Sequence, residues 1–375
     1  MEDNVIKVFM VVRWPVGGIR TFIKYVYSSW QSPALEIHFL TPNVAEVNTL
    51  KSELAHLKCY WYTTESENPG FKEFCIKANK IIGDNKFDLI HAHGFTSALS
   101  VAWKLPFLKC KAIFTSHDVL SDSQFQGVKG SLKKLAIALL LNRFSVIHSV
   151  SYDAEKNLQQ HLPLVNKEKC KVILNGVDTE RFFNAEPINL KQQLGIPDST
   201  RLIGFFGRFM SQKGFKYLVD AMEMLEASHP NQFKVICFGS GGFIREEKSA
   251  LQKRGLSELF YFHDHVSDTS PYVKSCDLVA MPSLWEACPL VPMEVLAAGV
   301  PMVASSCVGL GEVCLGTPAV MTEPANANAL SQAILDCSQL SPQLFNAYAN
   351  SARLRFAITE TRRQFQILYS GLVSS

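Results

Sequence analysis

The chain has 375 residues, of which 47% are hydrophobic and 19% charged, and its 37 basic and 34 acidic residues leave a formal net charge of +3. This length and composition predict a folded protein of two or three domains, and the small net charge excludes nucleic acid as the default partner. The ten cysteines form no CxxC pair and show no metal-ligand spacing, which is typical of reduced cytoplasmic thiols.

The first half of the chain alternates apolar strands with helical stretches. Residues 5–12 (VIKVFMVV) predict a buried strand, and a turn containing Gly17 and Gly18 leads into a helix that we expect to begin near Thr21. Further strands are expected at 36–42, 87–94, 111–120, 145–151 and 171–178. Repeated strand–helix units of this length predict a doubly wound parallel sheet whose polar strand ends meet at one edge.

Histidines lie at the ends of two of these strands. His91 and His93 alternate along one strand and should face the same side, a spacing that two metal ligands could share. No third ligand accompanies them at suitable spacing, so we expect no metal site, and at least one of the two should be satisfied in the core or at the rim. His117 lies beside Asp118 at the end of the next strand, just before a loop. A functional role is therefore more strongly indicated for His117 than for His91 or His93.

Residues 127–144 (GVKGSLKKLAIALLLNRF) predict an apolar helix with lysines and an arginine near its ends. We expect a core helix with a solvated basic edge; the alternative is a basic amphipathic face that touches anionic lipid headgroups. Its apolar run is far shorter than the ~20 residues of a spanning helix, and the acidic N-terminus lacks the basic region of a signal peptide. The sequence therefore predicts a cytoplasmic protein, with peripheral contact to the inner face of a membrane as an open alternative.

A polar, proline-bearing stretch at 184–200 predicts a domain boundary, after which a second strand–helix series begins at 201–207. The loop after this strand, GRFMSQKG, holds Arg208 and Lys213 between glycines at the start of a helix. Two cations beside free helical N–H groups predict a site for a doubly charged anion.

The next strand, within 233–242, ends in the turn Gly239-Ser240-Gly241. This turn begins like a dinucleotide-binding fingerprint, but Ile244 occupies the place of the third glycine. Without a complete fingerprint, an oxidoreductase that uses a nicotinamide cofactor is the least favoured function.

The stretch 281–303 (MPSLWEACPLVPMEVLAAGVPMV) contains two carboxylates eight positions apart. Glu286 lies in a turn after an apolar strand, and Glu294 lies near the start of a helix that Gly299 should end. Strand ends and helix N-termini are where open α/β sheets bind ligands, although a capping and a surface glutamate would explain the pair equally well on its own. The chain contains no DxD triplet, so the two cations, rather than a metal, are expected to neutralise a diphosphate.

Together these motifs resemble the retaining GT-B glycosyltransferases of family 4. The specific part is GRFMSQKG followed about seventy residues later by E-x7-E; the Gly17-Gly18 loop, SHDV at 116–119 and NGVDTERF at 175–182 support it. The resemblance extends from about residue 5 to the end of the chain. It implies two Rossmann-like domains that face each other across a cleft. Residues 1–183 would form the acceptor-side domain, with the last helix (356–375) packing back on it, and 184–355 the nucleotide-sugar domain.

The resemblance also implies roles for single residues. Arg208 and Lys213 would hold the diphosphate, Glu294 would contact the ribose, and Glu286 the hydroxyls of the transferred sugar. His117 would lie near that sugar, and the backbone of the early glycine loop would close over the phosphates. The implied catalytic set is His117, Arg208, Lys213 and Glu286, and the donor-binding set is Gly17, Gly18, Arg208, Lys213, Gly239, Val266, Glu286, Leu290, Val291 and Glu294.

Two departures from the family pattern bear on this site. Arg20 stands where many members carry an acidic residue, so either the acceptor is acidic or Arg20 is simply solvated. The usual EGFG is here Glu286-Ala287-Cys288-Pro289, and Pro289 has no N–H to donate. The amides of Leu290 and Val291 are then the expected phosphate donors.

The expected function is retaining transfer of a sugar from a nucleoside-diphosphate sugar to a carbohydrate or lipid-linked acceptor, in surface polysaccharide or lipopolysaccharide biosynthesis. No cofactor or metal is expected. One alternative is a sugar-nucleotide epimerase on the same fold, which would convert the donor without an acceptor. The other is a non-catalytic nucleotide-sugar-binding subunit, which would bind the nucleotide and transfer nothing.

Overall fold

The computed structural model describes residues 5–263 and 266–374. The chain divides into an N-terminal unit, Met1–Asn175 with Ile358–Ser375, and a C-terminal unit, Gly176–Ala357. The division after Asn175 comes earlier than the polar stretch 184–200, which belongs wholly to the C-terminal unit. The last helix belongs to the N-terminal unit.

A parallel sheet of seven strands forms the centre of the N-terminal unit. The strands are β1 (Ile6–Val12), β2 (Leu35–Thr41), β3 (Lys58–Thr63), β4 (Leu89–His93), β5 (Lys111–Ser116), β6 (Val146–Ser149) and β7 (Cys170–Val172). Their order is β3-β2-β1-β4-β5-β6-β7, so the direction of winding reverses between β1 and β4. In doubly wound sheets this reversal opens a crevice at the carboxyl ends of the strands.

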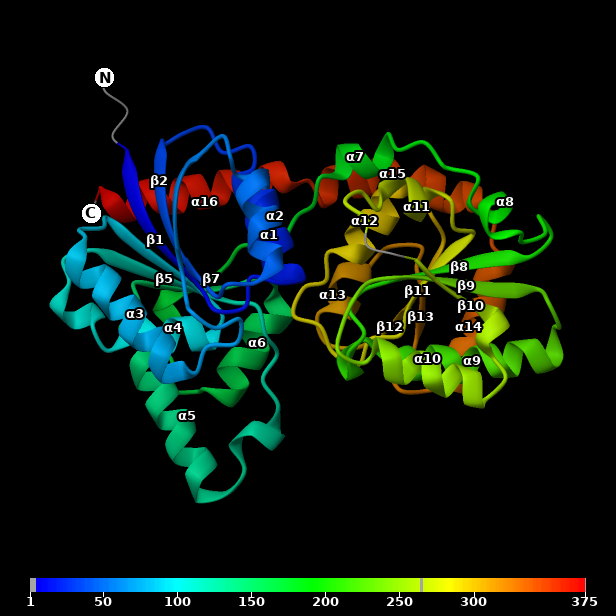
Figure 1. The fold of residues 1–375 in the computed structure, drawn as a ribbon, viewed down its shortest axis with the longest axis horizontal. Coiled ribbons are helices and arrows are strands. Elements are labelled where there is room, and N and C mark those ends of the chain that lie inside the picture. Colours follow the sequence, from blue (N-terminus) through cyan, green and yellow to red (C-terminus); the bar gives the residue numbers. More distant parts are fainter. Residues whose placement is uncertain (1–4, 264–265, 375) are drawn as a thin grey trace. The chain divides into compact units, whose positions relative to one another are not determined.

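Helices cover both faces of this sheet. They are α1 (Gly18–Tyr27), α2 (Ala45–Glu53), α3 (Phe71–Asp84), α4 (Phe95–Ala102), α5 (Gly127–Leu141), α6 (Tyr152–His161) and α16 (Ile358–Val373). On one face, α3, α4 and α5 bury a cluster that includes Phe74, Ile90 and Phe114. α16 packs with α1, where the rings of Phe22 and Phe365 lie 5.8 Å apart (Figure 1).

The C-terminal unit repeats the same plan with six parallel strands. They are β8 (Arg201–Phe206), β9 (Phe233–Phe238), β10 (Phe260–His263), β11 (Leu278–Met281), β12 (Met302–Ser305) and β13 (Val320–Thr322). The order β10-β9-β8-β11-β12-β13 makes β8 and β11 neighbours at the reversal point. Each strand expected from the sequence is present, and so are strands within 259–266 and 301–305 that its apolar runs also predict, whereas β3 and β13 were not predicted. β3 is an edge strand with no fully buried residue, and β13 spans three residues, so both lack a strong apolar signal.

The helices of the C-terminal unit are α7 (Thr179–Phe183), α8 (Leu190–Leu194), α9 (Phe215–Ser228), α10 (Ile244–Lys253), α11 (Ser270–Lys274), α12 (Val291–Ala298), α13 (Leu310–Cys314), α14 (Ala327–Gln339) and α15 (Pro342–Arg355). α9 packs against α14, while α12 packs against α15 and α7 (Figure 1). Every residue of α12 after Val291 is buried, which is why its sequence is apolar all round except for Glu294. Within the described ranges, no helix is long and apolar enough to cross a bilayer.

Candidate functional site

Lys213 and the buried Glu286 form an ion pair at the carboxyl edge of the C-terminal sheet. The chain separates them widely, but they follow β8 and β11, which are adjacent strands. Lys213 Nζ donates a hydrogen bond of 2.6 Å to Glu286 Oε1. Ser283 Oγ donates to the same oxygen at 2.7 Å, and Gln212 Nε2 donates to Oε2 at 3.4 Å. Only 5% of Glu286 is exposed, and a carboxylate this buried requires such charged and polar partners.

The loop that carries Glu286 is fixed by the loops on both sides of it. The Leu284 N–H donates to the Gln212 carbonyl at 2.8 Å, which joins it to the loop after β8. The Glu286 N–H donates to the Val308 carbonyl at 3.1 Å, which joins it to the loop after β12. A Cβ on Gly309, whose φ is 74°, would lie 2.1 Å from the Glu286 carbonyl oxygen. The close approach requires glycine, and the carboxylate is therefore held on three neighbouring loops.

The predicted glycine turn after β9 packs onto the loop that carries the two cations. Phe209 N–H donates to the Ser240 carbonyl at 2.9 Å, and a Cβ on Gly239 would lie 1.8 Å from the Gly207 carbonyl oxygen. Arg208, between these contacts, is exposed and forms no ion pair with any residue that the structure describes. One predicted cation therefore neutralises Glu286, and the other faces solvent.

The N-terminus of α12 follows shortly after Glu286. Leu290 is its buried N-cap and Val291, half-buried, is its first residue. The Glu294 N–H donates to the Leu290 carbonyl at 3.1 Å, and the Glu294 residue is 8% exposed. The first-turn N–H groups of Val291 and Met293 have no acceptor within the helix, which gives this end a partial positive charge.

Val266, a member of the implied donor-binding set, is half-buried and lies just beyond β10, the strand next to β9. The sequence also places His265 beside it, near the expected pocket for the nucleotide base, but His265 lies outside the described residues.

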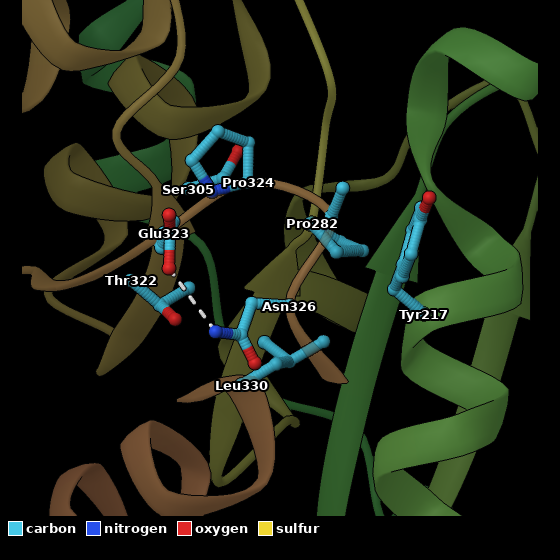
Figure 2. Close-up of a pocket in the computed structure, with 9 residues that line it drawn as sticks. Tyr217, Pro282, Ser305, Thr322, Glu323, Pro324, Asn326 and Leu330 are labelled. Atoms are coloured by element: carbon cyan, nitrogen blue, oxygen red, sulfur yellow. Dashed lines mark hydrogen bonds between the residues drawn. The ribbon is translucent and has the colours of Figure 1, made fainter. Parts of the chain in front are cut away.

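A small hollow lies further along the same edge, at the ends of β11, β12 and β13. Figure 2 shows Ser305, Glu323 and Thr322 on the left, Pro282 in the middle and Tyr217 of α9 on the right. Asn326 Nδ2 donates a hydrogen bond of 3.1 Å to Glu323 Oε2. None of the predicted donor-binding residues lines this hollow. It is therefore distinct from the ion-pair site.

In the N-terminal unit, a chain of buried hydrogen bonds starts at the Ile173 carbonyl, which can only accept. His148 Nε2 therefore donates to it at 3.0 Å, so His148 Nδ1 accepts from Thr115 Oγ1 at 3.0 Å. Thr115 Oγ1 in turn accepts from His91 Nε2 at 2.6 Å, and His91 Nδ1 accepts from the Tyr369 hydroxyl at 2.6 Å. One carbonyl thus fixes the tautomers of both histidines.

His93 and His117 continue this histidine cluster towards the strand ends. The His91 and His93 rings stack at 4.1 Å, which confirms the expectation that they face the same side. His93 Nδ1 lies 3.0 Å from His117 Nε2, while the buried His93 Nε2 has no hydrogen-bond partner among the described residues. Because an unpaired buried N–H is rarer than an unpaired acceptor, we place the His93 proton on Nδ1 and the His117 proton on Nδ1. Among the residues that the structure describes, no group of three His, Cys, Asp or Glu side chains is arranged to hold a metal.

Burial keeps the whole cluster neutral. It lowers the pKa of His91, His93 and His117 well below the usual histidine range. It lowers the pKa of His148 to about 4. At neutral pH these side chains therefore act as hydrogen-bonding groups without charge.

The early glycine loop lies at the end of β1. Gly17 caps α1 with φ 55° and Gly18 is the first residue of α1, three positions before the start that we expected. Arg20 is not freely solvated as one interpretation held: its side chain is 20% exposed, and Nη1 lies 3.8 Å from Glu53 Oε2. The same carboxylate pairs with Lys24 at 2.8 Å. The charge of Arg20 is therefore already partly balanced.

Comparison with known proteins decides the family. Residues 16–181 match the model described as Glycosyltransferase Family 4, and residues 200–339 match Glycosyl transferases group 1. The chain belongs to glycosyltransferase family 4. Members of this family retain the anomeric configuration of the sugar that they transfer.

Two relatives by sequence and one solved structure are similar to this chain. The lipopolysaccharide core biosynthesis mannosyltransferase LpsB of Rhizobium meliloti (strain 1021) is 29% identical over 213 residues, which cover 54% of this chain but only 61% of LpsB. The O-antigen biosynthesis glycosyltransferase WclY of Escherichia coli is 25% identical over 278 residues, 71% of this chain and 76% of WclY. The crystal structure of Anabaena Alr3699/HepE in complex with UDP and glucose has a TM-score of 0.80 and 22% identity, and covers 98% of this chain and 100% of that one. The likeness to HepE shows the GT-B fold.

Sequence reasoning missed residues that contact the predicted ones in each of the two units. Gln212 and Ser283 both donate to Glu286, and their places beside Lys213 and after β11 were signals that could have revealed them. Thr115 and Tyr369 had no such signal. They reach His91 from another strand and from the last helix, and only the fold brings them together.

Proposed function

We propose that this family 4 enzyme transfers a hexosyl group from a nucleoside-diphosphate sugar to a carbohydrate or lipid-linked acceptor, in the synthesis of surface polysaccharide or lipopolysaccharide. The observation that carries the proposal is the Lys213–Glu286 pair at the switch point of the C-terminal sheet. The exposed Arg208 and the N-terminus of α12 belong to the same edge. Two cations and unpaired helical N–H groups suit a diphosphate, and a buried carboxylate suits sugar hydroxyls.

In the proposed reaction, the bond between the anomeric carbon and the diphosphate oxygen breaks, and a bond from that carbon to the acceptor oxygen forms on the same face. The acceptor proton goes to the departing diphosphate, which gains negative charge. Arg208, Lys213 and the first-turn amides of α12 stabilise that charge where it develops. Glu286 holds the donor sugar through its hydroxyls, and Glu294 holds the ribose.

The N-terminal unit has the acceptor role in this proposal. His117 is neutral and offers its Nδ1 proton as a hydrogen-bond donor rather than as a charge. The glycine loop at Gly17 and Gly18 supplies backbone N–H groups for the phosphates. The names of LpsB and WclY, which assign them to lipopolysaccharide core and O-antigen biosynthesis, support an acceptor of the same class.

A thermal-shift panel with UDP, GDP, ADP, CMP and NAD tests the donor site directly, because a ligand that binds only the folded state raises Tm. The HepE complex with UDP makes UDP the first ligand to try. We expect one nucleoside diphosphate to raise Tm in the wild type and to lose that effect in Arg208→Ala. The matched control is Arg143→Ala, an exposed arginine of the N-terminal unit, which should keep the full shift. A shift with NAD alone, or with no ligand, would contradict the proposal.

The two rival functions differ in their products. Incubation of the enzyme with the donor alone should leave the donor sugar unchanged, whereas an epimerase would produce a new sugar nucleotide. Incubation with a donor and a lipopolysaccharide acceptor should give a lengthened glycan with the anomeric configuration of the donor. A protein that binds the nucleotide and gives no product with any acceptor would be a binding subunit.

A further inference from the structure

One face of α5 is apolar and exposed to solvent. Val128, Leu132, Leu135 and Leu139 are 79%, 62%, 41% and 56% exposed. They follow one another at intervals of four, three and four residues, so they form one stripe along the helix. Single exposed leucines are common on protein surfaces, but four large side chains in one stripe are not. The expectation of a core helix with a solvated basic edge therefore holds for the buried face of α5 but not for this exposed apolar face.

The opposite face of α5 accounts for its attachment to the fold. Gly130, Ile137, Ala138 and Leu141 are buried there, and the last three belong to the core shared with α3 and α4. The exposed stripe is thus not needed to hold the helix in place. In Figure 1, α5 lies at the lower edge of the N-terminal unit, and its start is the lowest part of that unit in the view.

The charged residues of the segment 127–144 are all basic. The basic residues of this segment are Lys129, Lys133, Lys134 and Arg143. None of them forms an ion pair with a described residue, although the amino groups of Lys133 and Lys134 lie 5.2 Å from the ring centre of Phe125. Between Asp122 and Asp153 the sequence contains no acidic residue at all.

We propose that the exposed stripe of α5 and its lysines dock the enzyme on an anionic phospholipid surface. A helix of 15 residues is about 22 Å long, too short for the ~30 Å hydrocarbon core, so it lies in the interface with its leucines among the upper acyl chains. The lysines face lipid phosphates, which supplies the second signal that stable peripheral binding requires.

The uniform positive charge favours a lipid surface over a second copy of the chain. Two copies that paired through this stripe would bring their lysines together without a compensating acid on either helix. An anionic bilayer offers both an apolar layer and a negative surface at the same depth. The inference goes beyond the proposed function, since it concerns a different surface and a different partner.

Vesicle co-flotation tests the proposal without nucleotide or acceptor. We expect the full chain to float with vesicles of phosphatidylcholine and phosphatidylglycerol in equal parts, and to remain unbound with phosphatidylcholine alone. Leu132→Ser combined with Leu139→Ser should weaken the partition at least about tenfold, because both leucines leave the apolar layer. Lys129→Gln combined with Lys133→Gln should weaken it about tenfold or more at low salt.

Matched controls separate this face from the rest of the surface. Leu315→Ser with Ile367→Ser removes two leucine-sized side chains that are 74% and 55% exposed elsewhere, and should leave flotation unchanged. Lys72→Gln with Lys253→Gln removes the same charge from exposed sites on other helices and should have a much smaller effect. Because all these side chains are exposed, the variants should fold, which an unchanged Tm verifies.

Three outcomes would overturn the proposal: no binding to anionic vesicles, binding that the α5 variants do not weaken, or a concentration-dependent dimer that only the leucine variant abolishes. The last result would make the stripe a contact between copies of the chain. The nucleotide panel measures the donor site alone. If no nucleoside diphosphate raised the Tm of the wild type while vesicle binding stayed intact, the proposed function would be rejected and this inference would stand.

Discussion

The ion pair between Lys213 and Glu286 predicts that a second substitution can restore the stability lost in Lys213→Ala without restoring its activity. Two unit charges 2.6 Å apart attract by roughly 6 kcal/mol at an effective dielectric of about 20. The side chains are 19% and 7% exposed, so desolvation offsets a large part of this attraction. Lys213→Ala leaves Glu286 buried beside only Ser283 and Gln212, and should lower the free energy of unfolding by about 2–3 kcal/mol. It should also lower kcat/KM about 100-fold or more, on the scale of a lost oxyanion donor.

Adding Glu286→Gln to Lys213→Ala removes the uncompensated charge. Most of the lost stability should return, while kcat/KM should remain as low as in the single variant or fall further. Urea unfolding and initial-rate kinetics on the four proteins of this cycle measure both effects. Arg363→Ala is the control, because Arg363 pairs with Glu360 at 2.7 Å with 59% and 55% of the side chains exposed, and its loss should not change stability measurably. Near-wild-type turnover of Lys213→Ala, or no recovery of stability in the double variant, would refute the reasoning.

Three further predictions concern the histidine cluster and the Glu286 loop. The pKa of His148 is about 4 in the folded protein and about 6.5 in the unfolded chain. Its contribution to the free energy of unfolding is therefore complete above about pH 6.5 and is lost as the pH falls from about 6.5 to about 4. Urea unfolding at pH 5 should show a loss of about 2 kcal/mol from this residue alone, and a stability that does not fall between pH 7 and pH 5 would contradict the assignment. Thr115→Val leaves two buried ring nitrogens, His91 Nε2 and His148 Nδ1, without this hydrogen-bond partner and should lower the free energy of unfolding by about 2–4 kcal/mol. Thr41→Val removes a buried hydroxyl that has no hydrogen-bond partner among the described residues and should be neutral or stabilising. Equal losses in the two variants would argue against the hydrogen-bond chain. Gly309→Ala drives a methyl group into the carbonyl of the site glutamate and should reduce kcat/KM at least about tenfold, while Gly255→Ala, at φ 69° with open space around it, should leave the kinetics intact.

Much of the fold could be predicted from the sequence because the apolar strands are short, buried and regularly separated by helices. Glu286, Glu294, Arg208 and Lys213 could be proposed as a set from their spacing and from their places after strands or at helix starts, and the structure brings Lys213 and Glu286 into contact. The same local rules failed at β3, where an edge strand exposes alternate residues, and at the start of α1, where a glycine rather than Thr21 begins the helix. The hydrophobic pattern also could not show which leucines of α5 are exposed, because the helix is apolar on both faces.

The sequence by itself determined which residue types stand at the strand ends, since hydrophobic periodicity and turn residues are local properties of the chain. Only the tertiary structure decided which of them touch. The order of strands makes β8 and β11 neighbours, and that adjacency turns Lys213 from a second free cation into the partner of Glu286. The last helix likewise brings Tyr369 to His91 across almost the whole length of the chain. Contacts of this kind depend on sheet order and helix packing, which a linear pattern does not encode.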